Sequence, residues 1–179
     1  PFAFPARVMA DKTEDLDDLV KRVDPDRWLS SRFIADPGLR ADVVALYAYD
    51  HELARAPKVA SNPLMGEIRL TWWREVLDEI FEGRHVRHHE TAQALADLVG
   101  RHGLPREPLE AMIDARYPEL GGGLLSASEA KAAEFGASGS LASLTIAILD
   151  RTEVVNSFPS GWAGIWALAL LVLDGRVAP

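Results

Sequence analysis

Four side chains of different chemistry stand close together in the first third of the chain: Asp50, His51, Glu52 and Arg55. If this segment is helical, His51 and Arg55 lie on one face, because residues four apart are neighbours on a helix. In a cavity, that face could hold an anionic head group. Ion pairs on solvated helix surfaces are common, so the same residues could instead form only a structural network.

Aromatic and basic side chains alternate in the next apolar segment. Trp72 and Trp73 could line an apolar tunnel, although large aromatic side chains more often pack in a core. Arginine suits phosphate recognition, but Arg74 can also pair with Asp78 one helical turn later. No catalytic residue is assigned, and the candidate ligand-binding residues are Tyr47, Asp50, His51, Glu52, Arg55, Arg69 and Trp73.

A polar segment then brings together His85, His88, His89 and Glu90. Imidazole and carboxylate are ligands for zinc or nickel. The spacing by itself does not establish a site, because metal ligands need a defined geometry and supporting hydrogen bonds. We therefore predict no metal ligand here.

The elements that would position these residues are helices, because apolar residues recur every three or four positions and alternating strand patterns are missing. The expected helices cover 13–23, 25–34, 39–56, 64–82, 91–99, 106–116, 126–150 and 161–173. In the clearest one, at 64–82, the recurring apolar residues are Met65, Ile68, Trp72, Val76 and Ile80, widened by Trp73 and Leu77.

Prolines, glycines and caps set the expected boundaries. Asp24–Pro25 and Asn62–Pro63 each combine an N-cap residue with proline at the first helical position. Pro37 and Gly38 are expected to break a helix, and Pro57 to stop or kink one. Gly83 is expected to end the helix at 64–82, and Ser126 with Glu129 fits a capping box.

Two late segments are unusual in composition. The helix expected at 126–150 is rich in Ala, Gly and Ser, so a neighbouring backbone or a ligand can approach it closely. The helix expected at 161–173 is apolar nearly all round, and such a helix must be buried in the core or against a partner.

Composition narrows the class of protein. A chain of 179 residues with 48% hydrophobic and 26% charged residues is typical of one globular domain. The net charge of -8 argues against a nucleic-acid surface, and the absence of cysteine excludes disulfides and thiolate metal sites. No continuous apolar leader is visible, and the apolar run at 163–173 is shorter than the roughly 20 residues that span a bilayer. A cytoplasmic protein is expected, with peripheral membrane contact left open.

Five segments taken in order resemble the squalene/phytoene synthase family. They are RWLSSRFIADPGLRADVVALYAY, GEIRLTWWREVLDEIFEG, PLEAMIDARYPEL, SEAKAAEFGASGSLASLTIAIL and GWAGIWALALLVL. The resemblance covers most of 26–173. It implies an all-α, isoprenoid-synthase-like helical bundle at 13–179, incomplete at its C-terminal side, with an N-terminal extension at 1–12.

The resemblance also implies two carboxylate clusters that hold Mg²⁺ against a departing diphosphate. The first cluster should follow ALYAY by a few residues, where this chain has Ala54, Arg55 and Lys58, while Asp50 and Glu52 lie one turn too early. The second should follow the last apolar helix, and the sequence given ends before it. Glu119 stands where the family places an acid before Leu, and it could be a leftover substrate-side carboxylate or a surface acid.

One branch of the family shares these departures. It contains an assembly factor of respiratory complex I and bacterial relatives, and its AFNxELA resembles AYDHELA here. The resemblance implies a non-catalytic protein without cofactor that binds a partner protein or a prenyl or lipid-like ligand. The alternatives are a plain scaffold, or an active prenyltransferase that condenses two prenyl diphosphates with Mg²⁺ on Asp50 and Glu52. Self-association into a homo-oligomer could cover the open side of the bundle.

Overall fold

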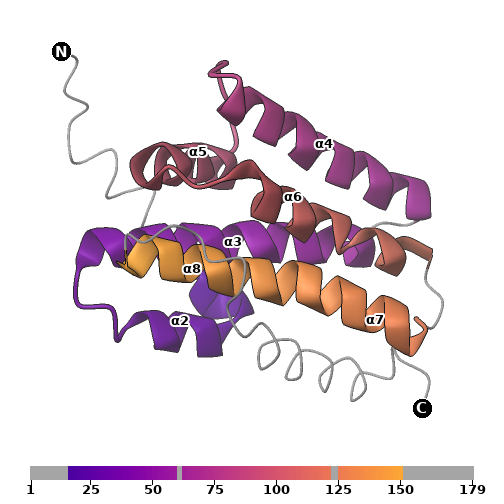
Figure 1. Cartoon of the computed structure of the whole chain (residues 1–179), viewed down its shortest axis with the longest axis horizontal. Coiled ribbons are helices and arrows are strands. Elements are labelled where there is room, and N and C mark those ends of the chain that lie inside the picture. Colours follow the sequence, from indigo (N-terminus) through magenta and orange to yellow (C-terminus); the bar gives the residue numbers. More distant parts are fainter. Residues whose placement is uncertain (1–15, 60–61, 122–124, 151–179) are drawn as a thin grey trace.

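The computed structural model describes residues 16–59, 62–121 and 125–150, and every regular element in these ranges is a helix (Figure 1). The all-α prediction is therefore confirmed. The predicted extension at 1–12 and the predicted helix at 161–173 lie outside the described residues.

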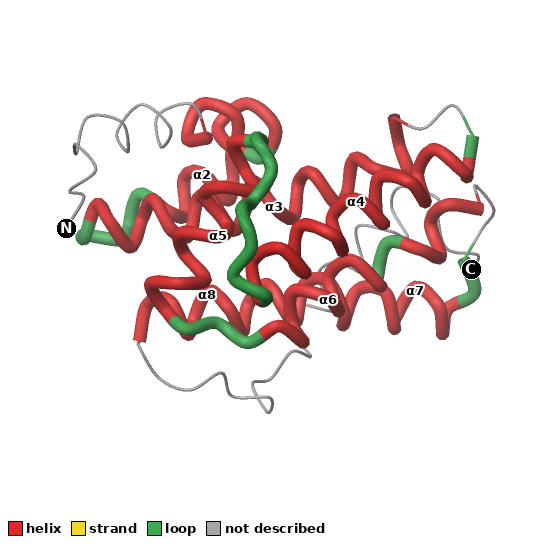
Figure 2. Tube along the Cα trace, turned by 90° about the horizontal axis from the view of Figure 1, so that it is seen from above, coloured by secondary structure: helices red, strands yellow, loops and turns green. Residues whose placement is uncertain are grey.

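Helix α3 lies at the centre of the bundle and packs against α2, α4, α5, α6 and α8. Seen from above, the helices are joined by short loops (Figure 2). Residues 16–23 are helical, and the elements that follow are α2 (Pro25–Ser31), α3 (Pro37–Val59), α4 (Pro63–Phe81), α5 (Glu90–His102), α6 (Arg106–Asp114), the 3-10 helix η1 (Tyr117–Gly121), α7 (Ala127–Glu134), the π-helical turn η2 (Phe135–Gly139) and α8 (Ser140–Asp150).

The cap-then-proline signature begins three helices rather than two. The side chain of Asp24 accepts a hydrogen bond from the amide of Arg27, and that of Asn62 accepts one from the amide of Met65, each at 3.0 Å. Asp36 does the same for α3, accepting from the amides of Gly38 and Leu39 at 2.7 and 2.9 Å. Pro37 thus starts α3, where the sequence pattern indicated only a break.

The ends of the helices differ modestly from the predictions. Helix α3 continues through Pro57 to Val59, because a proline in the last turn removes only one backbone hydrogen bond. Helix α2 ends at Ser31, three residues before the predicted end at 34. Gly83 has φ of +66°, the left-handed conformation that favours glycine after a helix, and the capping box of Ser126 with Glu129 forms as predicted.

The face that α4 buries agrees with the apolar repeat in its second half, where Trp73, Val76 and Leu77 are buried, but not in its first turn. Met65 and Ile68 are 41% and 52% exposed. The residues that α4 buries are Gly66, Leu70, Trp73, Val76, Leu77 and Glu79. Apolar residues surround most of this helix, so periodicity alone could not decide which stripe meets α3.

The small residues of α7, η2 and α8 allow a close approach to α6. A β-carbon built on Gly136 would lie 3.2 Å from the β-carbon of Ala115 and 3.3 Å from the carbonyl oxygen of Ala111. Ala-, Gly- and Ser-rich composition therefore serves backbone packing here.

The same region contains the one helix of the described part that is long and apolar enough to cross a membrane, Ala127–Leu149, with mean hydropathy 1.4. Core helices of soluble proteins can pass the same test of length and composition. Its buried residues recur at helical spacing and face the bundle core: Ala130, Ala133, Ala137, Leu141, Leu144 and Ile148.

Replacing Gly136 by valine is expected to destabilise the fold by about 1–3 kcal/mol, because the added methyl groups must displace α6. The free energy of unfolding in urea measures this effect. Gly100→Val is the matched control, since a β-carbon at Gly100 meets nothing within 4 Å, and it should change stability by less than about 0.5 kcal/mol. Equal losses in the two variants would contradict the close packing of η2 on α6.

Candidate functional site

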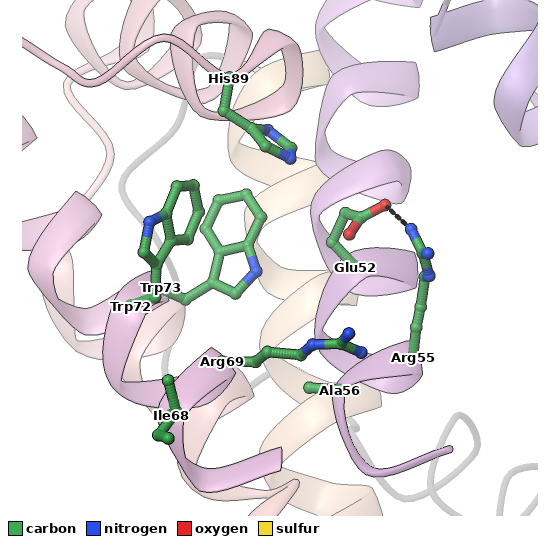
Figure 3. A pocket seen from close by; sticks show the side chains of 8 residues that line it. All are labelled: Glu52, Arg55, Ala56, Ile68, Arg69, Trp72, Trp73 and His89. Carbon is green, nitrogen blue, oxygen red and sulfur yellow. Dashed lines mark hydrogen bonds and ion pairs between the residues drawn. The ribbon is translucent and has the colours of Figure 1, made fainter. Parts of the chain in front are cut away.

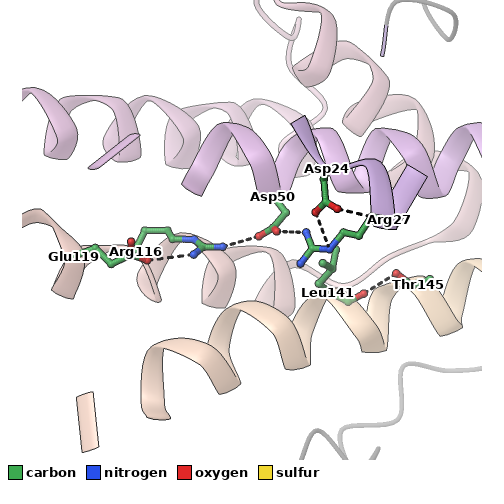
Figure 4. Close-up of polar contacts among 7 residues, drawn as sticks. All are labelled: Asp24, Arg27, Asp50, Arg116, Glu119, Leu141 and Thr145. Atoms are coloured by element: carbon green, nitrogen blue, oxygen red, sulfur yellow. Dashed lines mark hydrogen bonds and ion pairs between the residues drawn. The ribbon is translucent and has the colours of Figure 1, made fainter. Parts of the chain in front are cut away.

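Asp50 is buried between two arginines that come from distant parts of the sequence (Figure 4). Arg27 of α2 donates from Nη1 to Oδ2 at 2.6 Å, and Arg116, just after α6, donates from Nη2 to Oδ1 at 2.8 Å. Arg116 also donates to Glu119 of η1 at 3.2 Å. We call Arg27, Asp50, Arg116 and Glu119 the arginine clamp.

The electrostatics of the clamp keep Asp50 ionised. Burial alone would raise the pKa of this carboxyl group, but the charges and hydrogen bonds of Arg116 and Arg27 outweigh burial and hold its pKa below 3.8. Asp50 itself is only 4% exposed. Both of its oxygens are therefore occupied by guanidinium groups.

Of the other predicted site residues on α3, Tyr47 lies next to the clamp and His51 does not. Tyr47 lies beneath the guanidinium of Arg27, with 5.7 Å from the Arg27 Cζ to the ring centroid. His51 makes no hydrogen bond or ion pair with the described residues, and burial lowers its pKa. Glu119 is not the surface acid that was considered, because its side chain is 8% exposed and paired with Arg116.

A cavity of about 330 Å³ opens between α3 and α4, on another face of α3 (Figure 3). Four predicted site residues meet there: Glu52, Arg55, Arg69 and Trp73. We call it the tryptophan pocket, and its full lining is Glu52, Arg55, Ala56, Ile68, Arg69, Trp72, Trp73 and His89.

Aromatic rings form one wall of the tryptophan pocket. Trp72 and Trp73 meet edge-to-face at 4.9 Å between ring centroids, and His89 lies 5.3 and 5.4 Å from them. Trp73 also packs edge-to-face on Tyr49 at 5.2 Å. Trp73 is thus a core residue, as expected for a large aromatic, and also faces the cavity.

The loop before α5 is fixed to α4, which places His89 over the pocket. Glu79 accepts hydrogen bonds from the backbone amide of Arg87 at 3.0 Å and from its side chain at 2.6 and 2.9 Å. The Arg87 guanidinium in turn lies 5.1 Å from the ring centroid of Trp72. Burial lowers the pKa of His89 below 6.5, so its ring is neutral at neutral pH.

The residues at the two sites do not fit a magnesium diphosphate centre. Magnesium needs carboxylate oxygens that are free to coordinate it. Both oxygens of Asp50 accept hydrogen bonds from arginines, and Glu52 accepts one from Arg55 at 2.9 Å. Ala54, Arg55 and Lys58 offer no acidic ligand.

The other sequence hypotheses fare differently. Arg74 pairs with Asp114 rather than with Asp78, which instead accepts from Arg106 at 2.5 Å, so that predicted pair is wrong. The histidines of the polar loop are not gathered around one point. Among the described residues, no group of three or more His, Cys, Asp or Glu could hold a metal ion.

The described residues form an all-α bundle with a ligand-sized pocket between the two long helices α3 and α4. A sequence model of the squalene/phytoene synthase family matches residues 20–124, more than half of the chain. The chain belongs to the squalene/phytoene synthase family, as the sequence motifs predicted.

A curated relative lies in the branch expected from AYDHELA. The Bos taurus protein named NADH dehydrogenase (ubiquinone) complex I, assembly factor 6, is 28% identical over 103 residues, which is 58% of this chain. The matched stretch covers 30% of that relative, so the chain accounts for about a third of its length. No solved structure matches the chain.

Sequence reasoning missed the residues that pair with the predicted acids. Arg27 and Arg116 were not singled out, although each lies within a segment used for the family resemblance. His89 was considered only as a metal ligand, and its ring instead contacts the two tryptophans at steep angles of 60° and 78°. A buried Asp on α3 requires cations, but only the fold shows which arginines reach it.

Asp50→Asn should destabilise the protein by about 2–4 kcal/mol, because it removes the buried charge shared by Arg27 and Arg116 and leaves each guanidinium with one carboxylate partner, Asp24 and Glu119 respectively. Urea unfolding measures the loss. Glu82→Gln is the matched control, because Glu82 pairs with Arg84 where both side chains are more than half exposed, and it should cost less than about 1 kcal/mol. A cost for Asp50→Asn no larger than that of the control would show that the clamp contributes little.

The contribution of Asp50 should also depend on pH in a definite direction. Its folded-state pKa is lowered, so its stabilisation is complete at neutral pH and is lost as the pH falls through that pKa, below 3.8. The difference in unfolding free energy between the wild type and Asp50→Asn should therefore shrink in that acid range. Urea titrations at neutral pH and at steps below 3.8 would check this, and a difference that grows toward acid pH would contradict it.

Proposed function

We propose that this chain is a non-catalytic member of the squalene/phytoene synthase family that binds a protein partner or a prenyl or lipid-like ligand. The observation that carries the proposal is the arginine clamp. Asp50 is the buried acid nearest the expected metal cluster, and it already has Arg27 and Arg116 as counter-ions. With both oxygens bound to guanidinium groups, Asp50 is not available to hold the Mg²⁺ that would stabilise a departing diphosphate.

The partner proposal follows from the name of the relative. A protein named as a complex I assembly factor supports an assembly role for this chain, with a subunit or intermediate of a related respiratory complex as the partner. The tryptophan pocket supports a ligand role, since apolar cavities with a few polar groups are typical of small-molecule sites. The cytoplasmic location, contact with a membrane surface and self-association stay predictions from the sequence.

The purified chain, incubated with farnesyl diphosphate and Mg²⁺, should release no pyrophosphate above a protein-free control, because in the described part of the chain Asp50 and Glu52 are both paired with arginines. A coupled pyrophosphate assay measures this. The matched variant is Glu52→Gln, which should be indistinguishable from the wild type. If the wild type released pyrophosphate and Glu52→Gln did not, the chain would be an active prenyltransferase and the proposal would be wrong.

Disruption of the gene in the organism that encodes it should lower the amount of assembled complex I, since an absent assembly factor leaves its client incomplete. Native gels stained for NADH dehydrogenase activity measure the assembled complex, and re-expression of the intact gene should restore it. An unchanged amount of assembled complex I in the disrupted strain would contradict the assembly role. It would not affect the conclusion from the pyrophosphate assay on catalysis.

A further inference from the structure

Arg69 is a cation without a counter-ion in the tryptophan pocket. It lies on α4, is partly buried, and points across the cavity toward α3 (Figure 3). It makes no ion pair or hydrogen bond with the residues that the structure describes. Arg55 on the opposite side is already compensated, because Glu52 accepts its hydrogen bond at 2.9 Å. With His89 neutral, the lining carries one net positive charge.

The rest of the lining is suited to an apolar body. Trp72, Trp73, Ile68 and Ala56 make up half of the lining residues, so an apolar ligand in the pocket would contact apolar side chains from both α3 and α4. His89 closes one side of the aromatic wall with its ring against Trp72 and Trp73.

We propose that the tryptophan pocket binds, without a divalent metal ion, an apolar molecule with a single negative charge, of the class of fatty-acid carboxylates. This inference rests on the proposed function and specifies its ligand. A carboxylate matches Arg69, the lining arginine without a partner among the described residues, because a guanidinium and a carboxylate form two parallel hydrogen bonds. A diphosphate carries several negative charges, which one arginine cannot neutralise. The volume of about 330 Å³ is at the lower end for ligand pockets and fits a medium-length chain.

Decanoate, kept below its micelle-forming concentration and in the presence of EDTA, is the probe. Its binding can be followed by intrinsic fluorescence, because Trp72 and Trp73 line the pocket. We expect saturable binding to the full chain that Mg²⁺ does not strengthen. Decanol, which has the same chain without the charge, should bind at least about tenfold more weakly, since it lacks the charge-assisted hydrogen bonds.

The variant Arg69→Gln should lose about tenfold or more in decanoate affinity while decanol binding stays the same. Arg84→Gln is the matched control, because Arg84 is exposed, pairs with Glu82 and does not line the pocket; its decanoate affinity should equal that of the wild type. Arg69→Lys keeps the charge and should retain most of the affinity. Circular dichroism and urea unfolding of each variant show that the fold is intact.

Absence of saturable decanoate binding by the wild type would overturn the inference, as would equal affinity in Arg69→Gln and the wild type. Tighter binding of farnesyl diphosphate than of decanoate only when Mg²⁺ is present would also overturn it. These binding results are independent of the pyrophosphate assay. If decanoate does not bind and no pyrophosphate is released, the ligand class is wrong but the non-catalytic function stands.

Discussion

The ion pairs of Asp50 with Arg27 and Arg116 are the interaction on which the arrangement of this bundle depends. A carboxylate buried in a helix core is stable only when its charge is matched and its lone pairs are satisfied. The two arginines come from α2 and from the segment after α6, 23 and 66 residues away in sequence. The clamp therefore joins the central helix to one element that precedes it and one segment that follows it in the sequence.

The clamp also explains why one short stretch of α3 supports two different environments. Asp50 and Tyr47 face Arg27, where charge is neutralised, whereas Glu52, Arg55 and Ala56 face α4 and line the tryptophan pocket. Ala54, Arg55 and Lys58 stand where the family resemblance predicts acids. Because Arg69 has no counter-ion among the described residues, the lining of the tryptophan pocket carries a net positive charge, which favours an anion over a metal ion.

Several features of the fold followed from local chemistry in the sequence. Asp24–Pro25, Asn62–Pro63 and Ser126 with Glu129 each begin a helix because their side chains satisfy the free amides of the first turn. The periodic segments gave helices of nearly the predicted lengths. The apolar repeat of α4 was wrong only in the first turns: Met65 and Ile68 are exposed, and Gly66 and Leu70 are buried in their place.

The sequence by itself determined the helical class, the family, and the residue types near the cavity, because helix caps, periodicity and short motifs are local properties of the chain. Tertiary structure decided which charges meet. It joined Arg74 to Asp114, Arg106 to Asp78, and Arg116 to Asp50, and it left Arg69 facing a cavity without a described counter-ion. Such pairs connect helices far apart in sequence, and their energy depends on burial and on distances of a few ångströms, which only the packed bundle sets.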